Sequence, residues 1–251
     1  MVVRRLRRFL WLGLRVPPAS EVAEFRRSLV ALTDLTVSDL EALWRAWPWS
    51  DPQGVVQAAS EIVPDLVWAY QDVSGTLAAD QYDSWREAER VRGRFRASPA
   101  QLADEDQILA GVRSQLGPLF QVSPDVLSAQ SLLQGMVVRQ VMRGANDTIV
   151  ESTKRDPEAA GWKRVARADG CGFCRMLADR GGVYKKKTSR FASHGNCRCG
   201  SAPSWDGDER EVPVLAYVAS KRKKKPEERE ALREYLAEHF PEKETSAPTP
   251  A

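Results

Sequence analysis

All four cysteines of the chain lie within 29 residues, and one of its two histidines lies among them. The first pair is Cys171-Gly-Phe-Cys174, and the second segment is His194-Gly-Asn-Cys197-Arg-Cys199. The other 222 of the 251 residues contain no cysteine. Zinc in proteins is usually held by four thiolate sulfur or imidazole nitrogen atoms. The distribution therefore predicts a structural zinc site that clips two separate segments into one small module.

Five candidate ligands compete for four tetrahedral positions. Cys171, Cys174 and His194 are the first three, and the 19 residues between Cys174 and His194 suit a loop closed by zinc. Cys197 is the favoured fourth ligand, because His194-x-x-Cys197 repeats the spacing of the first pair. Cys199 is expected on the same side of a strand as Cys197, so it is a spare thiol or exchanges with Cys197. A site filled by protein ligands is typical of structural zinc, since catalytic zinc keeps one position for water.

Three other uses of the cysteines stay open. A disulfide framework would also use four cysteines, although such frameworks are usual in secreted domains shorter than about 100 residues. A thioredoxin-like redox pair would need Cys171 and Cys174 inside a βαβ unit, which the sequence does not show. A nucleophilic Cys–His pair for proteolysis would use one thiol beside His194 and leave the other thiols unexplained.

Positive charge is concentrated around the cysteines. The formal net charge of the chain is only +3, but residues 161–225 contain 16 Lys and Arg against 6 Asp and Glu. Phosphate contacts by such residues give nucleic-acid affinity that is independent of base sequence. We expect non-specific contact with double-stranded DNA, with a solvated loop and linker as the alternative, at two runs: Lys185, Lys186, Lys187, Lys221, Arg222, Lys223, Lys224 and Lys225. The arginine-rich stretch 82–96 is interpreted instead as a solvated helix face and loop.

The predicted fold class is α+β, with a mainly helical N-terminal region followed by a small β-rich, zinc-clipped module. One long central helix is predicted from the cap at Ser123-Pro124-Asp125 to Asp156-Pro157. Shorter helices are expected over 20–32, from a capping box at 38–41, from Pro52 with a break or kink at Pro64, and from a second capping box at 98–101. The expected divisions are a basic amphipathic arm at 1–18, a helical domain at 19–160, the module at 161–220, and at 221–251 a basic linker, a charged helix and a disordered tail.

No membrane segment is expected. The apolar stretch from Phe9 to Leu14 is shorter than the core of a signal peptide, and Arg15 interrupts it. No run of about 18 apolar residues occurs in the chain. Free thiols without an export signal indicate a reducing cytoplasm.

The motifs of residues 161–205 resemble the Mu F-like minor head proteins of tailed phages, and most closely the versions in phages of actinobacteria. The resemblance lies in the segments Trp162-Lys-Arg-Val165, Cys171-x-x-Cys174, His194-x-Asn-Cys197-x-Cys199 and Pro203-x-Trp205. It implies a virion protein that enters the phage head, is associated with the portal or the major capsid protein, and takes part in head morphogenesis. The host cytoplasm during assembly and the virion afterwards are the expected locations.

The resemblance leaves two alternative functions. Some relatives are labelled capsid maturation proteases, so a cysteine-type protease is the first alternative. We expect no enzyme, because the only other histidine, His239, lies in the charged tail helix. A cellular zinc-ribbon protein that binds nucleic acid is the second alternative.

Overall fold

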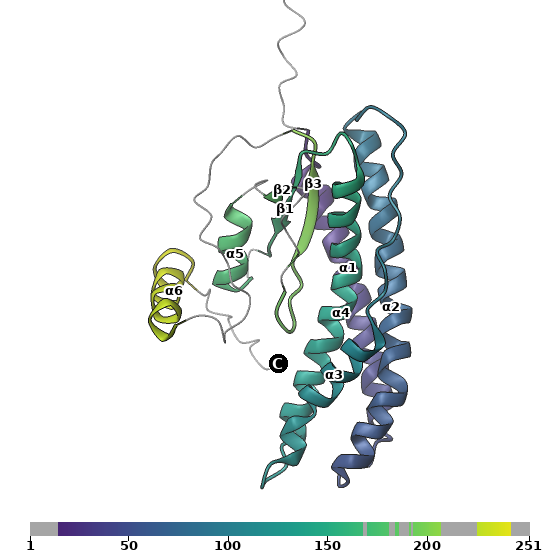
Figure 1. Cartoon of the computed structure of the whole chain (residues 1–251), viewed down its shortest axis with the longest axis vertical. Coiled ribbons are helices and arrows are strands. Elements are labelled where there is room, and N and C mark those ends of the chain that lie inside the picture. The colour runs from purple at the N-terminus through teal and green to yellow at the C-terminus, as the bar shows by residue number, and fades with distance from the viewer. Residues whose placement is uncertain are drawn as a thin grey trace, which may run out of the picture.

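The fold is mainly helical, with one small antiparallel sheet packed against a helical bundle (Figure 1). The computed structural model describes residues 15–167, 170–180, 184–185, 191, 193–206 and 225–241. The elements are α1 (Ala19–Trp44), α2 (Pro52–Ala88), α3 (Glu105–Gln115), the 3-10 helix η1 (Gly117–Phe120), α4 (Val126–Arg155), β1 (Gly161–Val165), α5 (Gly172–Asp179), β2 (Tyr184–Lys185), β3 (Gly200–Ser204) and α6 (Pro226–His239). The predicted helical N-terminal region is confirmed.

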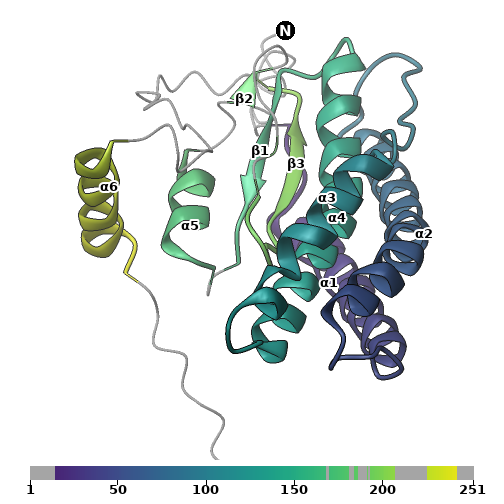
Figure 2. The same cartoon turned by 60° about the horizontal axis from the view of Figure 1, so that its bottom comes forward.

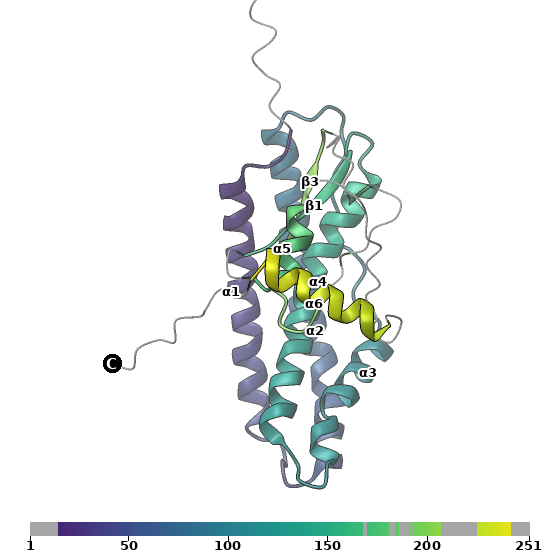
Figure 3. The same cartoon turned by 90° about the vertical axis from the view of Figure 1, so that its left-hand side faces the viewer.

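The elements form successive layers. The sheet has the order β2-β1-β3, and Gly161 of β1 lies opposite Ser204 of β3 and Lys185 of β2. Figure 2 shows the sheet between the bundle and α5, with α6 outside α5. Figure 3 shows α1, α2 and α4 running side by side behind the sheet, α5 and α6. The sheet therefore joins the helical bundle to the two outer helices.

Helix α4 is the central packing element, as its sequence predicts. The Asp125 carboxylate caps its start by accepting a 2.9 Å hydrogen bond from the Ser128 amide, and the helix ends at Asp156. Helix α4 packs against α1, α2, α3 and β3. Close approach to α2 requires a small residue at Gly144, because a Cβ there would lie 2.6 Å from the carbonyl oxygen of Gln71.

Two local predictions in the bundle are wrong, and of the break or kink expected at Pro64 the break is excluded. Helix α1 continues without interruption through the expected capping box at 38–41, and Leu40 is fully buried within it. Pro64 does not break α2, which extends on both sides of it. The segment 98–101 is not helical as expected, because the Ala100 amide donates to the Thr148 hydroxyl and, just after the segment, the Ala103 amide donates to the Gln71 side chain. Neither partner of this segment is near it in sequence.

The hydrophobic core continues from the bundle onto the sheet. One buried cluster contains residues of α1, α2 and α4 together with Ala202 of β3 and Trp205 just after it. Tyr82 and Trp205 pack edge to face with ring centroids 5.7 Å apart. This shared core fixes the sheet against the bundle. One cysteine-bearing segment follows β1 and the other leads into β3, so each segment is fixed at the end where it joins the sheet.

Some predictions lie outside the described residues. They are most of the N-terminal arm (1–14), the strand expected at 212–218 and the tail from 242 to 251. The charged helix after Pro226 is confirmed as α6. In the described part of the chain, no helix combines the length and apolarity that a membrane span needs.

Candidate metal centre

The first pair of cysteines lies at the start of α5. Cys171 caps the helix and Cys174 lies in its first turn, so the pair occupies a helical turn rather than the tight loop expected. The Arg175 side chain fixes the entry to this helix by donating a 2.9 Å hydrogen bond to the Gly170 carbonyl oxygen. Cys171 is partly exposed, whereas Cys174 is buried. One helical turn therefore presents two thiols to the same point.

The second segment is a tight turn that sits directly on α4. Asn196 has a left-handed backbone (φ 57°), and the Cys197 amide donates a 3.2 Å hydrogen bond to the His194 carbonyl oxygen. The Asn196 amide donates to the carbonyl oxygen of Gly135 at 3.2 Å. A Cβ at Gly135 would lie 2.9 Å from the Asn196 side-chain nitrogen, so a larger residue there would require the Asn196 carboxamide to move.

Further contacts with the bundle hold the end of this segment. The Asn146 side chain of α4 donates a 3.1 Å hydrogen bond to the Cys199 carbonyl oxygen. Arg198 forms a 2.6 Å ion pair with Asp34 of α1. Cys197 and Cys199 precede β3 rather than lying in a strand, contrary to expectation, yet both are buried in one cluster with Cys174. The bundle thus positions the second set of donors, and α5 positions the first.

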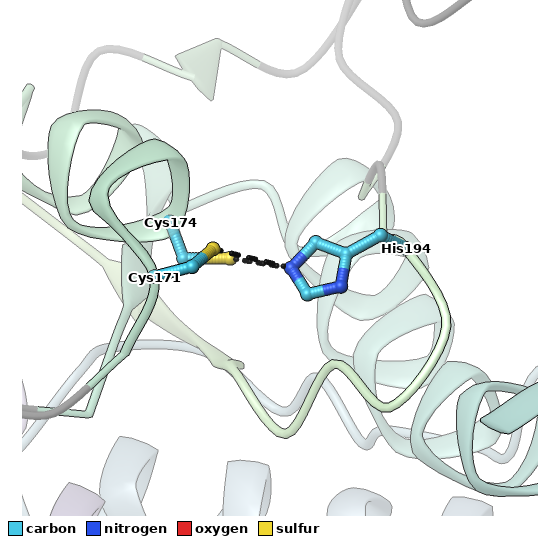
Figure 4. A group of neighbouring side chains, drawn as sticks. All are labelled: Cys171, Cys174 and His194. Carbon is cyan, nitrogen blue, oxygen red and sulfur yellow. Dashed lines mark hydrogen bonds between the residues drawn. The ribbon is translucent and has the colours of Figure 1, made fainter. Parts of the chain in front are cut away.

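Three distances between the donor atoms suit the edges of a tetrahedral metal site. The Nε2 atom of His194 lies 3.3 Å from the Cys171 sulfur and 3.4 Å from the Cys174 sulfur (Figure 4). The Cys174 sulfur lies 3.8 Å from the Cys197 sulfur. A tetrahedral zinc site with Zn–S bonds of about 2.3 Å and Zn–N bonds of about 2.05 Å has S–S edges of about 3.8 Å and S–N edges of about 3.5 Å. The three distances match these edges.

The five donors form two overlapping groups that share Cys174. One group is Cys171, Cys174 and His194, and the other is Cys174, Cys197 and Cys199, with the donor atoms of each group within 4.8 Å of one another. All four cysteines are free thiols, so the disulfide alternative does not describe this structure. The residues present fit a metal ion with a preference for sulfur and imidazole nitrogen.

Crowding of the thiols favours a cation among them. Hydrogen bonds with Cys174 and His194 lower the pKa of Cys171 to about 4. Contact with Cys174, then with Cys199, likewise lowers the pKa of Cys197. Hydrogen bonding to Cys171 and Cys197 raises the pKa of Cys174 well above its usual range, because Cys174 keeps its proton between two thiolates. A bound dication would replace that proton and stabilise the thiolates together.

The histidine is oriented for coordination through one nitrogen. Its Nδ1 atom lies 2.7 Å from the carbonyl oxygen of Gly195, which can only accept, so Nδ1 carries a proton. Nε2 therefore faces the two sulfur atoms and is the coordinating atom once deprotonated. Contact with Cys171 raises the pKa of His194 to about 9. Metal binding must therefore displace a proton from this ring as well.

A family model described as VG15 protein matches residues 17–236. The chain belongs to the VG15 protein family. This is a family of viral gene products, and membership is consistent with a phage structural protein. No curated protein and no solved structure matches the chain.

Three arginine side chains lie near the thiols. Arg164 of β1 is buried, with its Nη1 atom 4.0 Å from the Cys174 sulfur and its guanidinium 3.9 Å from the centre of the Phe191 ring. Arg167 and Arg198 line a cavity of about 190 Å³ beside the five donors. Positive charge near the donors stabilises the thiolate form of the cysteines. It also offsets the net negative charge of a zinc ion that is bound by three or four thiolates.

The predicted nucleic-acid contacts are only partly described. Lys185 lies in β2, and Lys225 is exposed immediately before α6. The remaining members of the two runs lie outside the described residues: Lys186, Lys187, Lys221, Arg222, Lys223 and Lys224. Their contact with DNA stays a prediction.

Sequence reasoning missed the residues of the bundle that hold the second segment in place. Gly135 and Asn146 lie on α4, and Asp34 lies on α1, far from the cysteines in sequence. One signal was present, because Asn146 interrupts the apolar face made by Met142 and Ile149. A buried asparagine in a central helix indicates a polar partner from another segment.

Proposed function

We propose that this VG15 protein is a non-enzymatic structural component of a phage head, of the Mu F-like minor head type found in phages of actinobacteria. A structural zinc ion holds its C-terminal module together, with Cys171, Cys174, His194 and Cys197 as ligands. The observation that carries the zinc assignment is that three distances between sulfur and imidazole donors equal tetrahedral edges, in two groups of donors that share Cys174. When bound, zinc supplies a cross-link rather than a reactive centre.

The size of the module explains the need for a metal. Trp162 of β1 stacks on Tyr184 of β2 at 4.4 Å, and Tyr184 donates a hydrogen bond to the carbonyl oxygen of Leu177 in α5. Beyond these aromatic contacts, the buried cluster around α5 consists mainly of the cysteines themselves. A core this small gives little hydrophobic stabilisation, and metal binding commonly replaces it.

The bundle offers a surface for a capsid partner. Phe120 ends η1, Val122 follows it and Leu127 is the second residue of α4, and all three side chains are exposed. Figure 1 shows the start of α4 at the lower tip of the bundle. Exposed apolar side chains gathered at one place are typical of protein contact sites. We assign this tip to the portal or major capsid protein, and the lysine runs at 185–187 and 221–225 to non-specific contact with packaged DNA.

Two experiments test the proposal. Metal analysis of protein purified under reducing conditions should find about one zinc per chain, as a four-ligand site requires. A photo-crosslinking residue at Leu127 should capture the portal or major capsid protein during head assembly, whereas the same residue at the exposed Leu35 of α1 should not. Absence of metal contradicts the zinc assignment, and equal capture from both positions contradicts the docking tip.

One observation favours a second function, a cysteine-type protease of capsid maturation. The Cys171 thiol lies at the start of a helix, 3.3 Å from His194 Nε2, and its pKa is lowered by contact with Cys174 and His194. This is the arrangement of an activated nucleophile. Against it, His194 lies nearly as close to Cys174, at 3.4 Å, as expected for ligands of one ion.

Single serine substitutions separate the two functions. A nucleophile predicts that Cys171→Ser abolishes cleavage of the capsid protein while folding and zinc content are unchanged. A metal site predicts that Cys171→Ser and Cys174→Ser both lower zinc content and thermal stability. The measurements are zinc stoichiometry, the thermal transition and cleavage of the capsid protein in assembling heads.

A further inference from the structure

An arginine-rich loop lies at the end of the bundle opposite the apolar tip. It follows α2 and contains four exposed arginines in seven residues: Arg90, Arg92, Arg94 and Arg96. Figure 1 shows this connection arching over the upper end of α2 before it returns along the bundle. Neither the zinc site nor the lysine runs account for this surface.

The loop is held from below by a buried arginine. Arg86 donates hydrogen bonds to the carbonyl oxygens of Val91 at 3.4 Å, of Gly93 at 3.1 Å, and of Arg92. The Arg86 guanidinium is itself fixed by a 3.1 Å ion pair with the buried Asp156. Gly93 has a left-handed backbone (φ 83°) that turns the chain at this point. The backbone that carries Arg92 and Arg94 is therefore fixed before any ligand arrives.

The far side of the loop is also anchored. The Phe95 ring packs against Tyr82 with centroids 5.9 Å apart. The Ala97 amide donates a 3.0 Å hydrogen bond to the Asp83 carboxylate, which also pairs with Arg96 at 3.4 Å. A fixed backbone lowers the entropic cost of binding a ligand through the side chains that project from it.

Three arginine side chains lie near one another at this end of the bundle. Within the part of the chain that the structure describes, no carboxylate forms an ion pair with Arg92, Arg94 or Arg155. Arg155, at the end of α4, is held by neutral oxygen atoms instead, donating to the Ser98 hydroxyl at 2.8 Å and the Ser98 carbonyl at 3.2 Å. All three arginines line one cavity of about 230 Å³, together with Arg86 and a single acidic residue, Glu158, so positive charge is in excess there.

We infer that Arg92, Arg94 and Arg155 form a site for the phosphate groups of a nucleic-acid backbone. Guanidinium forks match phosphate oxygens in pairs, and a row of them suits a polyanion with closely spaced charges better than a single carboxylate. The contact carries no base specificity. This site replaces the interpretation of the stretch as a solvated loop, and it is independent of the zinc module and its lysine runs.

The test uses the full chain and a 20-base-pair duplex, with binding measured by fluorescence anisotropy over a series of salt concentrations. The double variant Arg92→Ala/Arg94→Ala should bind about tenfold or more weakly, as expected from losing charged hydrogen bonds. Its slope of log affinity against log salt should be smaller by about 1.8, the value for two phosphate contacts. The matched control is Arg45→Ala/Arg113→Ala, which removes two exposed arginines elsewhere on the bundle.

Three kinds of result would overturn the inference, and the third kind has two forms. The first is no duplex binding by the wild-type chain, and the second is equal weakening in both double variants. The third is equal binding of poly-glutamate of the same total charge, or complete displacement of the duplex by inorganic phosphate at constant ionic strength, since either removes the nucleic-acid assignment. Zinc content and the circular dichroism spectrum should be unchanged in both variants, so failure of this site is distinguishable from failure of the metal centre.

Discussion

The Asp156 carboxylate accepts a 2.9 Å hydrogen bond from the indole nitrogen of Trp205, although 49 residues separate them. The same oxygen accepts hydrogen bonds from Tyr82 and Arg86, each at 3.1 Å. Asp156 ends α4, Trp205 follows β3, and the other two residues belong to α2. One buried carboxylate therefore connects the bundle, the sheet and, through Arg86, the arginine loop.

Replacing this carboxylate should destabilise the whole protein. Asp156→Asn leaves the buried Arg86 guanidinium without its counter-charge, a change that typically costs about 3–5 kcal/mol. The control is Asp147→Asn, which removes an exposed ion pair with Arg143 and should cost at most about 1 kcal/mol. Urea denaturation followed by tryptophan fluorescence gives both values. Similar losses in the two variants would show that the buried pair has no special role.

The same carboxylate should make stability sensitive to acid. Burial raises the pKa of Asp156, but hydrogen bonds from Trp205 and Arg86 outweigh burial and hold the pKa below its usual value. A carboxyl group with a lowered pKa in the folded state stabilises the fold above its unfolded pKa of about 3.9 and loses that contribution as pH falls through the folded value.

The urea midpoint should therefore fall more steeply below about pH 4 in the wild-type protein than in Asp156→Asn. Comparing the two proteins cancels the loss of metal at low pH, because both keep the same ligands. Parallel pH profiles would contradict the lowered pKa of Asp156.

The sequence predicts the structure correctly where the contacts that determine it are local. Both ends of α4 could be predicted, because Asp125 caps its own helix and Pro157 prevents continuation. The grouping of the cysteines and His194 was likewise visible, since donor spacing reflects the chemistry of one ion.

Prediction failed where distant contacts decide the structure. The sequence predicts that Arg86 lies on a solvated helix face. In the structure Arg86 is buried, because its side chain donates a hydrogen bond to Asp156, 70 positions later in the chain. The capping-box pattern at 98–101 does not start a helix, because Thr148 accepts the amide of Ala100 and Gln71 accepts the amide of Ala103 just after it. The turn that carries His194 is held by the carbonyl oxygen of Gly135 in α4, a contact that no local pattern near the cysteines reveals.

Close contact between α2 and α4 should make Gly144 intolerant of any side chain. An added Cβ would lie 2.6 Å from the Gln71 carbonyl oxygen and would also clash with the Ser74 hydroxyl. We expect Gly144→Ala to cost about 1–3 kcal/mol or more, because the backbone of α2 must move.

Gly111→Ala in α3 is the control, since its Cβ would meet the flexible Met136 side chain at 3.5 Å. That variant should gain up to about 1 kcal/mol from helix propensity. Thermal unfolding of both variants checks the contrast, and a stable Gly144→Ala protein would contradict the close helix packing.

The choice between Cys197 and Cys199 as fourth ligand can be decided by two variants with the same chemical change. The Cys197 sulfur lies 3.8 Å from that of Cys174, an edge length of the zinc tetrahedron, so Cys197→Ser should lose the metal. Cys199→Ser should retain about one zinc per chain, because Asn146 fixes the Cys199 backbone whatever its side chain. Zinc content after dialysis against a competing chelator measures the difference, and thermal unfolding should show the large loss of stability that accompanies removal of a structural zinc. Loss of zinc only in Cys199→Ser would reverse the assignment, and loss in both variants would mean that both thiols hold the ion.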